Sequence, residues 1–507
     1  MFKAYLLAII FLIAGCQKAP EPKNQHIVHF NIGSEPQTLD PRKARSLNDI
    51  NVVKLFFQGL TRINSNDQPE LAAAETYTVS EDGTLYTFKL RPQRWSNGDW
   101  VKAHDFVNTW QTTLAPDFPT DNVFQLYIIK NAKAVKEGRL PLSELGIKAL
   151  DTQTLTIELE HPVPYLFELL SRPIFFPLHP SEDTSISNGP FYLSAWQHQD
   201  HLCAEKNAYY WDRDSMHLSG LKMVIVSEDT ALKMFENKEL DWIGSPFSII
   251  PTDAIPYLKE KKQLNISPFS GTAWIRINTH HKPFDNPNIR KAFAYALDRQ
   301  ALVTHVTQGS QIPSTGIVPQ NFWMTQPHHF ADANLESARQ LISAIAPITN
   351  TITLLYAAGD RNHKMAQALQ SQWKEVLGIT VELEAVETKV YFSRISNQDY
   401  QLSIGSWIAD FADPINFLDV FKTKSVGTNN THWENVVYEQ LLDQSNQTLD
   451  VNQRQALLCK AEEILISEMP VIPLFTYSLL YVKNEKLKNV TISSMGSLDF
   501  THAYLEE

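Results

Sequence analysis

The sequence contains little glycine and almost no cysteine. It has 18 glycines and 3 cysteines among 507 residues, whereas soluble proteins usually contain about 7% glycine. So little glycine argues against glycine-rich phosphate loops, and three cysteines are too few for a disulfide scaffold. The 56 acidic residues outnumber the 44 basic ones and give a net charge of −12. This excess of negative charge argues against nucleic acid as the main partner.

Common catalytic and cofactor motifs are also missing. The chain has no GxxxxGK[ST] loop, no GxGxxG after a strand, no HExxH and no GxSxG. None of the close histidine pairs has the helical i, i+4 spacing and nearby carboxylate of a zinc site; they are His26/His29, His198/His201, His280/His281 and His328/His329. We therefore predict surface or loop histidines, no metal, no cofactor and no catalytic residue. An extracytoplasmic hydrolase or metalloenzyme is kept as an alternative.

Only the beginning of the chain has a long apolar run. Lys3 is followed by eleven apolar or aromatic residues, Ala4 to Ala14, which are too few to span a bilayer but enough for a signal peptide. The run ends in Ile13-Ala14-Gly15-Cys16, which resembles a bacterial lipobox. The resemblance implies that residues 1–15 are a signal peptide, that Cys16 carries lipid and that 16–23 is a tether. A plain secretory signal with an incidental cysteine is the alternative.

The rest of the chain mixes strand and helix patterns. At roughly 150 residues per domain, its length suggests about three domains. Alternating or apolar runs predict strands at 27–32, 85–92, 154–160, 221–227, 351–359 and 403–407. Helical spacing predicts helices at 289–308, 335–346, 361–377 and 452–467, the last capped by Asn452. We expect an α/β (α+β) fold, with Cys203 on a strand and Cys459 on a helix, either free or paired.

A series of short segments follows in a characteristic order. They are EPQTLDP (35–41), LFFQGL (55–60), DGTLYTFKLR (82–91), WSNG (95–98), AHDF (103–106), LGIKA (145–149), PVPY (162–165), SNGPF (187–191), KN (206–207), YW (210–211), RKAF (290–293), ALDR (296–299), QWK (372–374), LGI (377–379), WIADF (407–411), DP (413–414) and FL (417–418). Each is weak alone, but their order resembles the oligopeptide-binding proteins of ABC importers, family 5 of the bacterial extracellular solute-binding proteins.

The resemblance implies a two-lobed periplasmic-binding-protein fold with a hinge and an extra domain on the first lobe. Mapped onto this sequence, the first lobe comprises 24–64, 178–262 and 483–507. The extra domain is 65–177, and the second lobe is 263–482. The ligand would lie between the lobes.

The resemblance also implies a ligand site around Asp410. The pattern SIGSW (403–407) reads as an apolar strand, and Asp410 follows among aromatic residues. A carboxylate in apolar surroundings is costly to keep charged without a partner. In the family, the matching aspartate receives the α-ammonium of the bound peptide, while the strand, here Ser406, Trp407 and Ile408, bonds the peptide backbone. A capping or turn aspartate is the alternative.

The carboxylate end of the ligand departs from the family pattern. Family members that hold a tripeptide have an arginine three residues before the motif tryptophan, and here that position is Ile404. The family histidine near the carboxylate of longer peptides corresponds to His363, with a surface helix histidine as the alternative. Phe124 and Tyr127 are candidate aromatic walls. We therefore expect tetra- and pentapeptides to bind better than tripeptides.

The expected protein is an extracytoplasmic binding lipoprotein and not an enzyme. The resemblance implies a monomer on the periplasmic side of a bacterial membrane, anchored through Cys16. It would deliver short peptides to separate permease and ATPase subunits. The alternatives keep the fold but change the ligand to glutathione, a cell-wall peptide, haem or a nickel complex, or make the protein a peptide-holding chaperone or adhesin.

Overall fold

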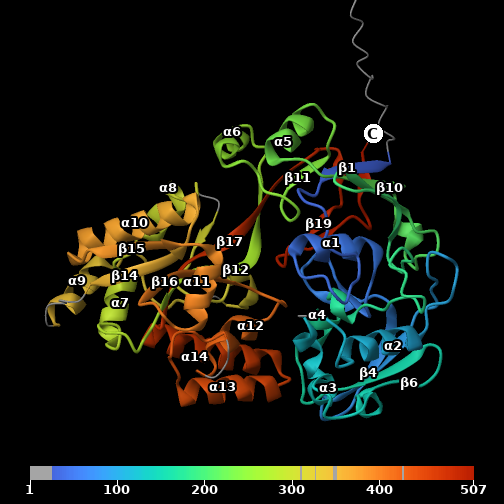
Figure 1. Cartoon of the computed structure of the whole chain (residues 1–507), viewed down its shortest axis with the longest axis horizontal. Helices are drawn as coiled ribbons and strands as arrows, with labels where there is room; N and C mark the ends of the chain where they lie inside the picture. Colours follow the sequence, from blue (N-terminus) through green and yellow to red (C-terminus); the bar gives the residue numbers. More distant parts are fainter. Residues whose placement is uncertain are drawn as a thin grey trace, which may run out of the picture.

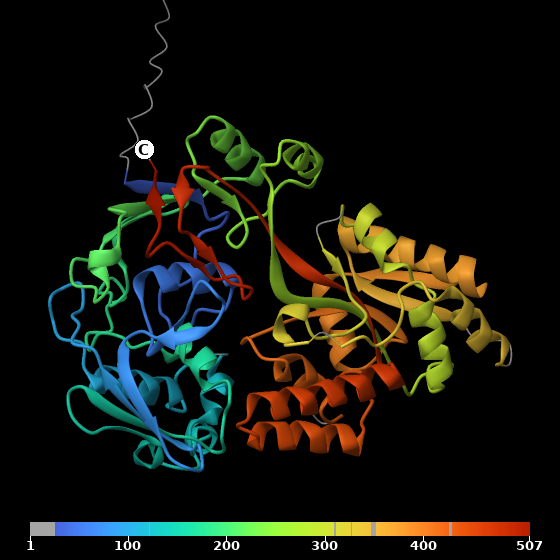
Figure 2. The same cartoon turned by 180° about the vertical axis from the view of Figure 1, so that it is seen from behind.

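Figure 1 shows the computed structural model of the chain, whose described part comprises residues 26–120, 122–308, 311–325, 327–345, 351–424 and 428–506. The expected signal peptide, Cys16 and the tether at 16–23 lie outside this part. The chain forms two lobes, and long strands run from one lobe into the other (Figure 1 and Figure 2). None of the described helices is long and apolar enough to cross a membrane. The expected mixed α/β fold with two lobes is confirmed.

Two antiparallel strands, β12 (Asn265–Ile277) and β17 (Val471–Lys483), connect the lobes. They lie in the middle of an eleven-stranded sheet with the order β15-β14-β16-β12-β17-β11-β1-β10-β9-β8, and β13 (Ile312–Pro313) pairs with β17 outside this path. The register of the β12–β17 pair shifts between Pro268 and Thr272, where the ladder passes between the lobes. An irregular ladder bends its strand locally. This irregular stretch is the part of the ladder that joins the two lobes.

The first lobe contains half of the large sheet. Its strands are β1 (Ile27–Asn31), β8 (Phe191–Gln197), β9 (His201–Lys206), β10 (Gly220–Val224) and β11 (Trp242–Gly244). Helix α1 (Leu47–Phe56) begins at a capping box, in which the Ser46 side chain and the Asp49 side chain each accept from the other's backbone N–H. The remaining elements are α5 (Glu228–Glu236), α6 (Ile255–Glu260) and the C-terminal pairs β18 (Leu487–Lys488) with β21 (Tyr504–Leu505) and β19 (Thr491–Ile492) with β20 (Leu498–Asp499).

A smaller sheet lies beside α1, at the bottom of Figure 1. Its order is β4-β5-β7-β6, with β4 (Ala74–Val79), β5 (Leu85–Leu90), β7 (Thr154–Glu158) and β6 (Ile147–Ala149). The accompanying elements are β2 (Thr61–Ile63), β3 (Pro69–Leu71), α2 (Ala103–Leu114), η1 (Val123–Ile128), α3 (Ala132–Lys136) and α4 (Leu166–Leu170). One hydrophobic core contains Phe30 and Phe56 of the first lobe together with Phe88 and Trp110 of this unit. The two units therefore share one core.

The second lobe has a hydrophobic core of its own, which includes Trp274, Trp373 and Phe417. Its strands are β14 (Ile352–Ala357), β15 (Val381–Val386) and β16 (Leu402–Ile408). Its helices are α7 (Pro287–Tyr295), α8 (Arg299–His305), α9 (Leu335–Ser343), α10 (Asp360–Leu377), α11 (Thr388–Ser396), α12 (Ile415–Leu418), α13 (Val436–Gln447) and α14 (Val451–Glu468). Since the two cores are separate, the lobes can move as two bodies.

The strands predicted from the sequence are all present, but two details of the helices were wrong. The helix expected at 289–308 is divided into α7 and α8, because the Asp298 side chain accepts from the backbone N–H of Ala301 at 2.7 Å and starts a new helix. The cap of α14 is Asp450 and not Asn452, since Asp450 accepts from the backbone N–H of Gln453 at 2.8 Å.

Candidate functional site

Asp410 lies just beyond the end of β16, where three hydrogen bonds fix the chain. The Asn416 side chain, on α12, accepts from the backbone N–H of Asp410 at 3.2 Å and from the Trp407 indole at 2.8 Å. The backbone N–H of Ala409 donates to the Ser270 carbonyl of β12 at 2.8 Å. Asp410 is therefore held in a defined position at the edge of the second lobe.

The end of β16 has an open edge. β12 pairs with all of β16, but β14 pairs only with Leu402 and Ser403. Because Ala409 bonds to β12 and antiparallel pairs alternate, Ser406 and Ile408 direct their backbone groups away from β12. No strand within the described residues pairs with them on that side. Of the three strand residues predicted, Ser406 and Ile408 can thus bond an added chain, whereas Trp407 faces β12.

Asp410 contacts an arginine of the other lobe. Its carboxylate lies 3.7 Å from the guanidinium of Arg172, which also donates to the backbone carbonyl of Asp410. The Arg172 Nε donates to Gln125 of η1 at 3.0 Å. The Asp410 side chain keeps 36% of its exposure and Arg172 keeps 17%. Burial raises the pKa of Asp410, and the positive charge of Arg172 opposes this rise.

Aromatic and charged side chains surround this pair. The rings of Tyr165 and Phe411 stack at 4.3 Å with an interplanar angle of 9°, and both residues pack against both hydrophobic cores. Burial and the nearby Asp413 carboxylate raise the pKa of Glu168, on α4, to about 7. The segment around α4 is therefore a direct contact between the lobes.

A cavity of about 450 Å³ opens beside Ile408. Residues of both lobes line it: Phe247 and Ile249 come from the first lobe, and Arg361 and Lys364 come from α10 in the second. Its volume is within the range of sites for small ligands. Ile408 therefore belongs both to the open edge of β16 and to the lining of this cavity.

Three expected side chains lie outside this cavity's lining. His363 is exposed, and its Nδ1 lies 2.7 Å from the Tyr356 hydroxyl. Phe124, on η1, is 52% exposed. Tyr127 packs against the core of the first lobe.

Sequence reasoning missed Arg172 and Arg361. Arg172 is the one cation in the apolar, proline-containing stretch 162–178, where a buried charge requires a partner. This signal could have identified it. Arg361 lies two residues before His363, in the first turn of α10, which begins at Asp360. A sequence prediction that started this helix at residue 360 would have placed Arg361 beside the candidate His363.

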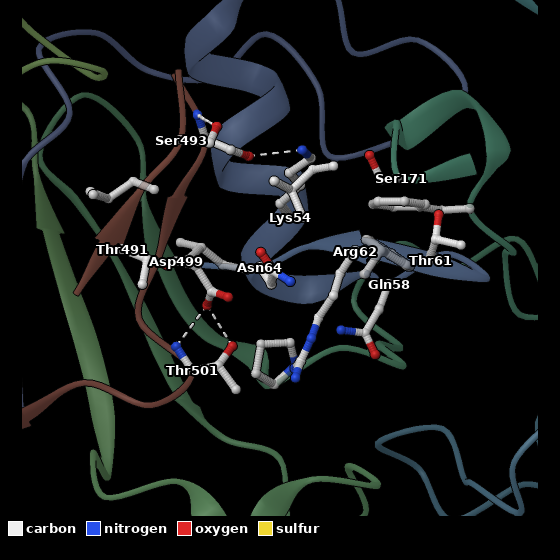
Figure 3. A pocket seen from close by; sticks show the side chains of 17 residues that line it. Lys54, Gln58, Thr61, Arg62, Asn64, Ser171, Thr491, Ser493, Asp499 and Thr501 are labelled. Carbon is white, nitrogen blue, oxygen red and sulfur yellow. Dashed lines mark hydrogen bonds between the residues drawn. The ribbon is translucent and has the colours of Figure 1, made fainter. Parts of the chain in front are cut away.

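A second cavity, in the first lobe, is too small for a peptide. Figure 3 shows its polar lining, including Lys54, Arg62 and Asp499, and its volume is about 60 Å³. The Lys54 ammonium donates to the Ser497 hydroxyl at 2.8 Å, and burial lowers the Lys54 pKa to about 7. None of the predicted site residues lines this cavity.

Histidine and cysteine do not form a metal cluster within the described residues. Cys203 and Cys459 are free and lie in different lobes. His329 lies in a loop, as predicted, but its side chain is buried 3.0 Å from the buried Glu462 carboxylate. Glu462 also accepts from the backbone N–H groups of Ile317 and Val318 at 2.8 and 2.9 Å. This cluster joins α14 to a loop and is structural.

Comparison with known proteins identifies the family of this chain. The model of the bacterial extracellular solute-binding proteins, family 5 Middle, matches residues 68–429. The oligopeptide-binding protein OppA of Bacillus subtilis (strain 168) is 38% identical over 511 aligned positions, which cover 96% of this chain and 94% of that protein.

Solved structures are similar over almost the whole chain. MppA, a periplasmic murein tripeptide binding protein in its unliganded open form, superposes with a TM-score of 0.86 at 26% identity, covering 95% of this chain and 98% of that chain. Another structure of MppA, from Escherichia coli, gives a TM-score of 0.76 at 26% identity, covering 96% of this chain and 99% of that chain. The lobes of this chain are thus arranged like those of an open, unliganded form.

Proposed function

The chain belongs to family 5 of the bacterial extracellular solute-binding proteins, and we propose on this basis that it captures short peptides between its lobes and delivers them to an ABC importer. The observation that carries this proposal is the open edge of β16, which leads to the Asp410 carboxylate at the boundary of the lobes. The relative named as an oligopeptide-binding protein supports the ligand class. In this role the protein binds its ligand without transforming it.

The proposed binding mode follows from the geometry of the edge. A peptide in extended conformation can add to β16, bonding the backbone groups of Ser406 and Ile408. Its α-ammonium would then meet Asp410. Backbone bonds do not depend on side-chain identity, and water can fill roomy side-chain pockets. Many short peptides would therefore bind alike.

We propose that the peptide carboxylate lies in the cavity beside Ile408. Arg361 and Lys364 line that cavity, and a guanidinium can bond a carboxylate through two parallel N–H groups. His363, expected from the family pattern, would have to leave Tyr356 to take part. Phe124, next to the Gln125 that holds Arg172, is better exposed than Tyr127 to act as an aromatic wall.

Closure of the lobes would complete the site. A ligand favours closure only to the extent that it binds the closed form more tightly. The ammonium–Asp410 pair provides such a difference, because closure removes water from it. The irregular ladder between Pro268 and Thr272 is the proposed hinge.

We propose a first lobe of 24–64, 178–262 and 483–507, an extra domain of 65–177 and a second lobe of 263–482. In support of this division, the four-stranded sheet lies within 65–177, and the boundaries at 263 and 483 fall at the first-lobe ends of the connecting strands β12 and β17.

An extracytoplasmic location fits the family, and we propose that lipid on Cys16 anchors the protein to the membrane, with 16–23 as the tether. Monomeric protein would deliver its ligand to separate permease and ATPase subunits. A Cys16→Ala variant should lose the membrane association. Retention at the membrane after this change would contradict the anchor.

Calorimetry with a tetrapeptide tests the proposed function. Asp410→Asn should weaken binding of a free-amine peptide by about 2–5 kcal/mol, as when a desolvated charge loses its partner. N-acetylation should weaken binding to the natural protein similarly. Asp399→Asn, which changes an aspartate whose side chain is 70% exposed in the same lobe, is the control and should bind normally. Equal affinity for both peptides would refute the assignment of Asp410.

The same titrations separate the alternative ligands. Mass spectrometry of freshly purified protein under native conditions identifies any ligand retained from the cell. A cell-wall peptide is the alternative most worth testing, since MppA is named as a murein tripeptide binding protein. Binding of unfolded protein in preference to short peptides would favour a chaperone instead.

A further inference from the structure

Asp410 already has a cationic partner in this open arrangement. The Arg172 guanidinium lies 3.7 Å from its carboxylate and donates to its backbone carbonyl. Arg172 belongs to the unit that carries α4, whereas Asp410 belongs to the second lobe. The carboxylate assigned to the ligand ammonium is thus in contact with an arginine of the other lobe.

We propose that Arg172 is the resident counter-ion of Asp410 in the empty protein, and that the ammonium of an incoming ligand must displace it. Arg172 would then determine how strongly the site prefers a free amine. This inference rests on the proposed function, because it takes Asp410 as the ammonium site.

The surroundings of Arg172 suit a resident counter-ion. Gln125 holds its Nε at 3.0 Å, so the guanidinium stays near Asp410 without a ligand. The stacked rings of Tyr165 and Phe411 hold the same two segments together. Arginine is always charged at neutral pH. Arg172 therefore gives the partly buried Asp410 carboxylate a charged partner, and an unpaired buried carboxylate would destabilise the protein.

The pair is also loose enough to be exchanged. A separation of 3.7 Å is longer than the roughly 2.7–2.9 Å of a strong charge-assisted hydrogen bond. Asp410 keeps 36% of its side-chain exposure, so a small ammonium group can approach it. An N-acetylated terminus lacks the charge needed to replace a guanidinium. An acetylated peptide would therefore bind without displacing Arg172, and Arg172 competes only with ligands that carry a free amine.

Other charged groups stand close to the pair. Lys54, on α1, repels the charge of Arg172. Glu168, on α4, is near both Asp413, which follows β16, and Arg454, on α14. Asp413 and Arg454 neutralise each other at 2.6 Å. Arg172 thus remains the principal charged partner of Asp410.

The test compares three variants by calorimetry with the same tetrapeptide, free and N-acetylated. Arg172→Gln removes the competing charge and should raise the affinity for the free-amine peptide about tenfold, the value of an ion pair of about 1.4 kcal/mol. Affinity for the acetylated peptide should stay within about twofold on the same scale. Arg172→Lys keeps a competing cation and should resemble the natural protein. Arg139→Gln, at an arginine side chain that is 61% exposed, is the control.

The pH profile provides a signature that a purely structural role would not produce. Arg172 lowers the pKa of Asp410, so removing it should raise that pKa further. The affinity of Arg172→Gln for the free-amine peptide should then fall more steeply between pH 7 and pH 5 than that of the natural protein.

Ligand-free protein supplies a measurement that does not depend on peptide binding. Arg172→Gln and Asp410→Asn should each change Tm, and the double variant should change it by less than the sum. Additive changes would overturn the resident pair. Equal weakening of both peptides by Arg172→Gln, or no effect on the free-amine peptide, would overturn displacement. A third outcome is that the Tm changes are coupled but the natural protein binds both peptides equally. That result would refute recognition of the ammonium by Asp410, and the displacement of Arg172 with it.

Discussion

Arg454 donates two hydrogen bonds to the Asp413 carboxylate, at 2.6 and 2.8 Å, and both side chains are buried. Arg454 comes from α14, and Asp413 lies three residues beyond Asp410. The Asp413 carboxylate also accepts from the backbone N–H of Ile415 at 2.9 Å. This pair therefore ties the segment after β16 to the body of the second lobe, and it supports the position of Asp410.

Arg454→Met should lower the free energy of unfolding by about 3–5 kcal/mol, because it leaves a buried carboxylate without its partner. The double variant Arg454→Met/Asp413→Leu should recover much of this loss, since no buried charge remains. Urea unfolding followed by fluorescence measures both. The control is Lys424→Gln, which breaks the exposed pair with Glu434 and should cost less than about 1 kcal/mol. A small effect of Arg454→Met would show that water reaches Asp413.

Arg361→Gln should weaken binding of a peptide with a free carboxylate by about 1.5–3 kcal/mol, the usual contribution of a hydrogen bond to a charged group. A C-terminally amidated peptide should bind both proteins alike. Isothermal titration calorimetry with the two peptides measures the difference. Arg339→Gln, at an exposed arginine of α9, is the matched control. A larger loss from His363→Ala than from Arg361→Gln would return the role to His363.

Peptides of four or five residues should bind more tightly than tripeptides. Ile404 provides no charge where tripeptide-holding relatives are expected to have an arginine, so a short peptide would leave its carboxylate unpaired. Calorimetry with alanine peptides of three, four and five residues tests this expectation. Tightest binding of the tripeptide would contradict it.

Folding stability should decrease as pH rises, through Glu168. Its pKa is raised to about 7 in the folded protein, above the value of about 4.3 for a free glutamate. The folded state therefore holds a proton that the unfolded state releases in this window. The stabilisation is complete below about pH 4 and is lost by about pH 8, with an upper limit of about 4 kcal/mol. Urea midpoints of the natural protein and Glu168→Gln should be closest near pH 4 and separate increasingly up to pH 8, with the variant more stable. Parallel midpoints across this range would rule out the effect.

The sequence predicted β16 and the position of Asp410 because both are local features. An apolar strand followed by an aspartate among aromatic residues is visible within ten residues. The division between α7 and α8 was missed because the apolar spacing continues through it, while the decisive bond from Ala301 to Asp298 depends on the backbone turning there. Asp450 was passed over for Asn452 for the same reason, since both are good capping residues.

Contacts between distant segments could not be predicted in this way. Arg172 and Asp410 are 238 residues apart, and only the docking of the α4 segment against the second lobe brings them together. The open edge of β16 likewise depends on β14, which pairs only with its first two residues. A periodic pattern identifies a strand but does not say how much of it a neighbouring strand will cover.

The hydrophobic core that the first lobe shares with the smaller sheet also limits how the molecule can change shape. A body with a continuous, close-packed interior moves as a unit. The three domains expected from the sequence would then move as only two bodies. In the proposed function, a transporter subunit that contacts either body can then detect whether the lobes are closed. The first lobe and the smaller sheet move together, so they report the same position relative to the second lobe.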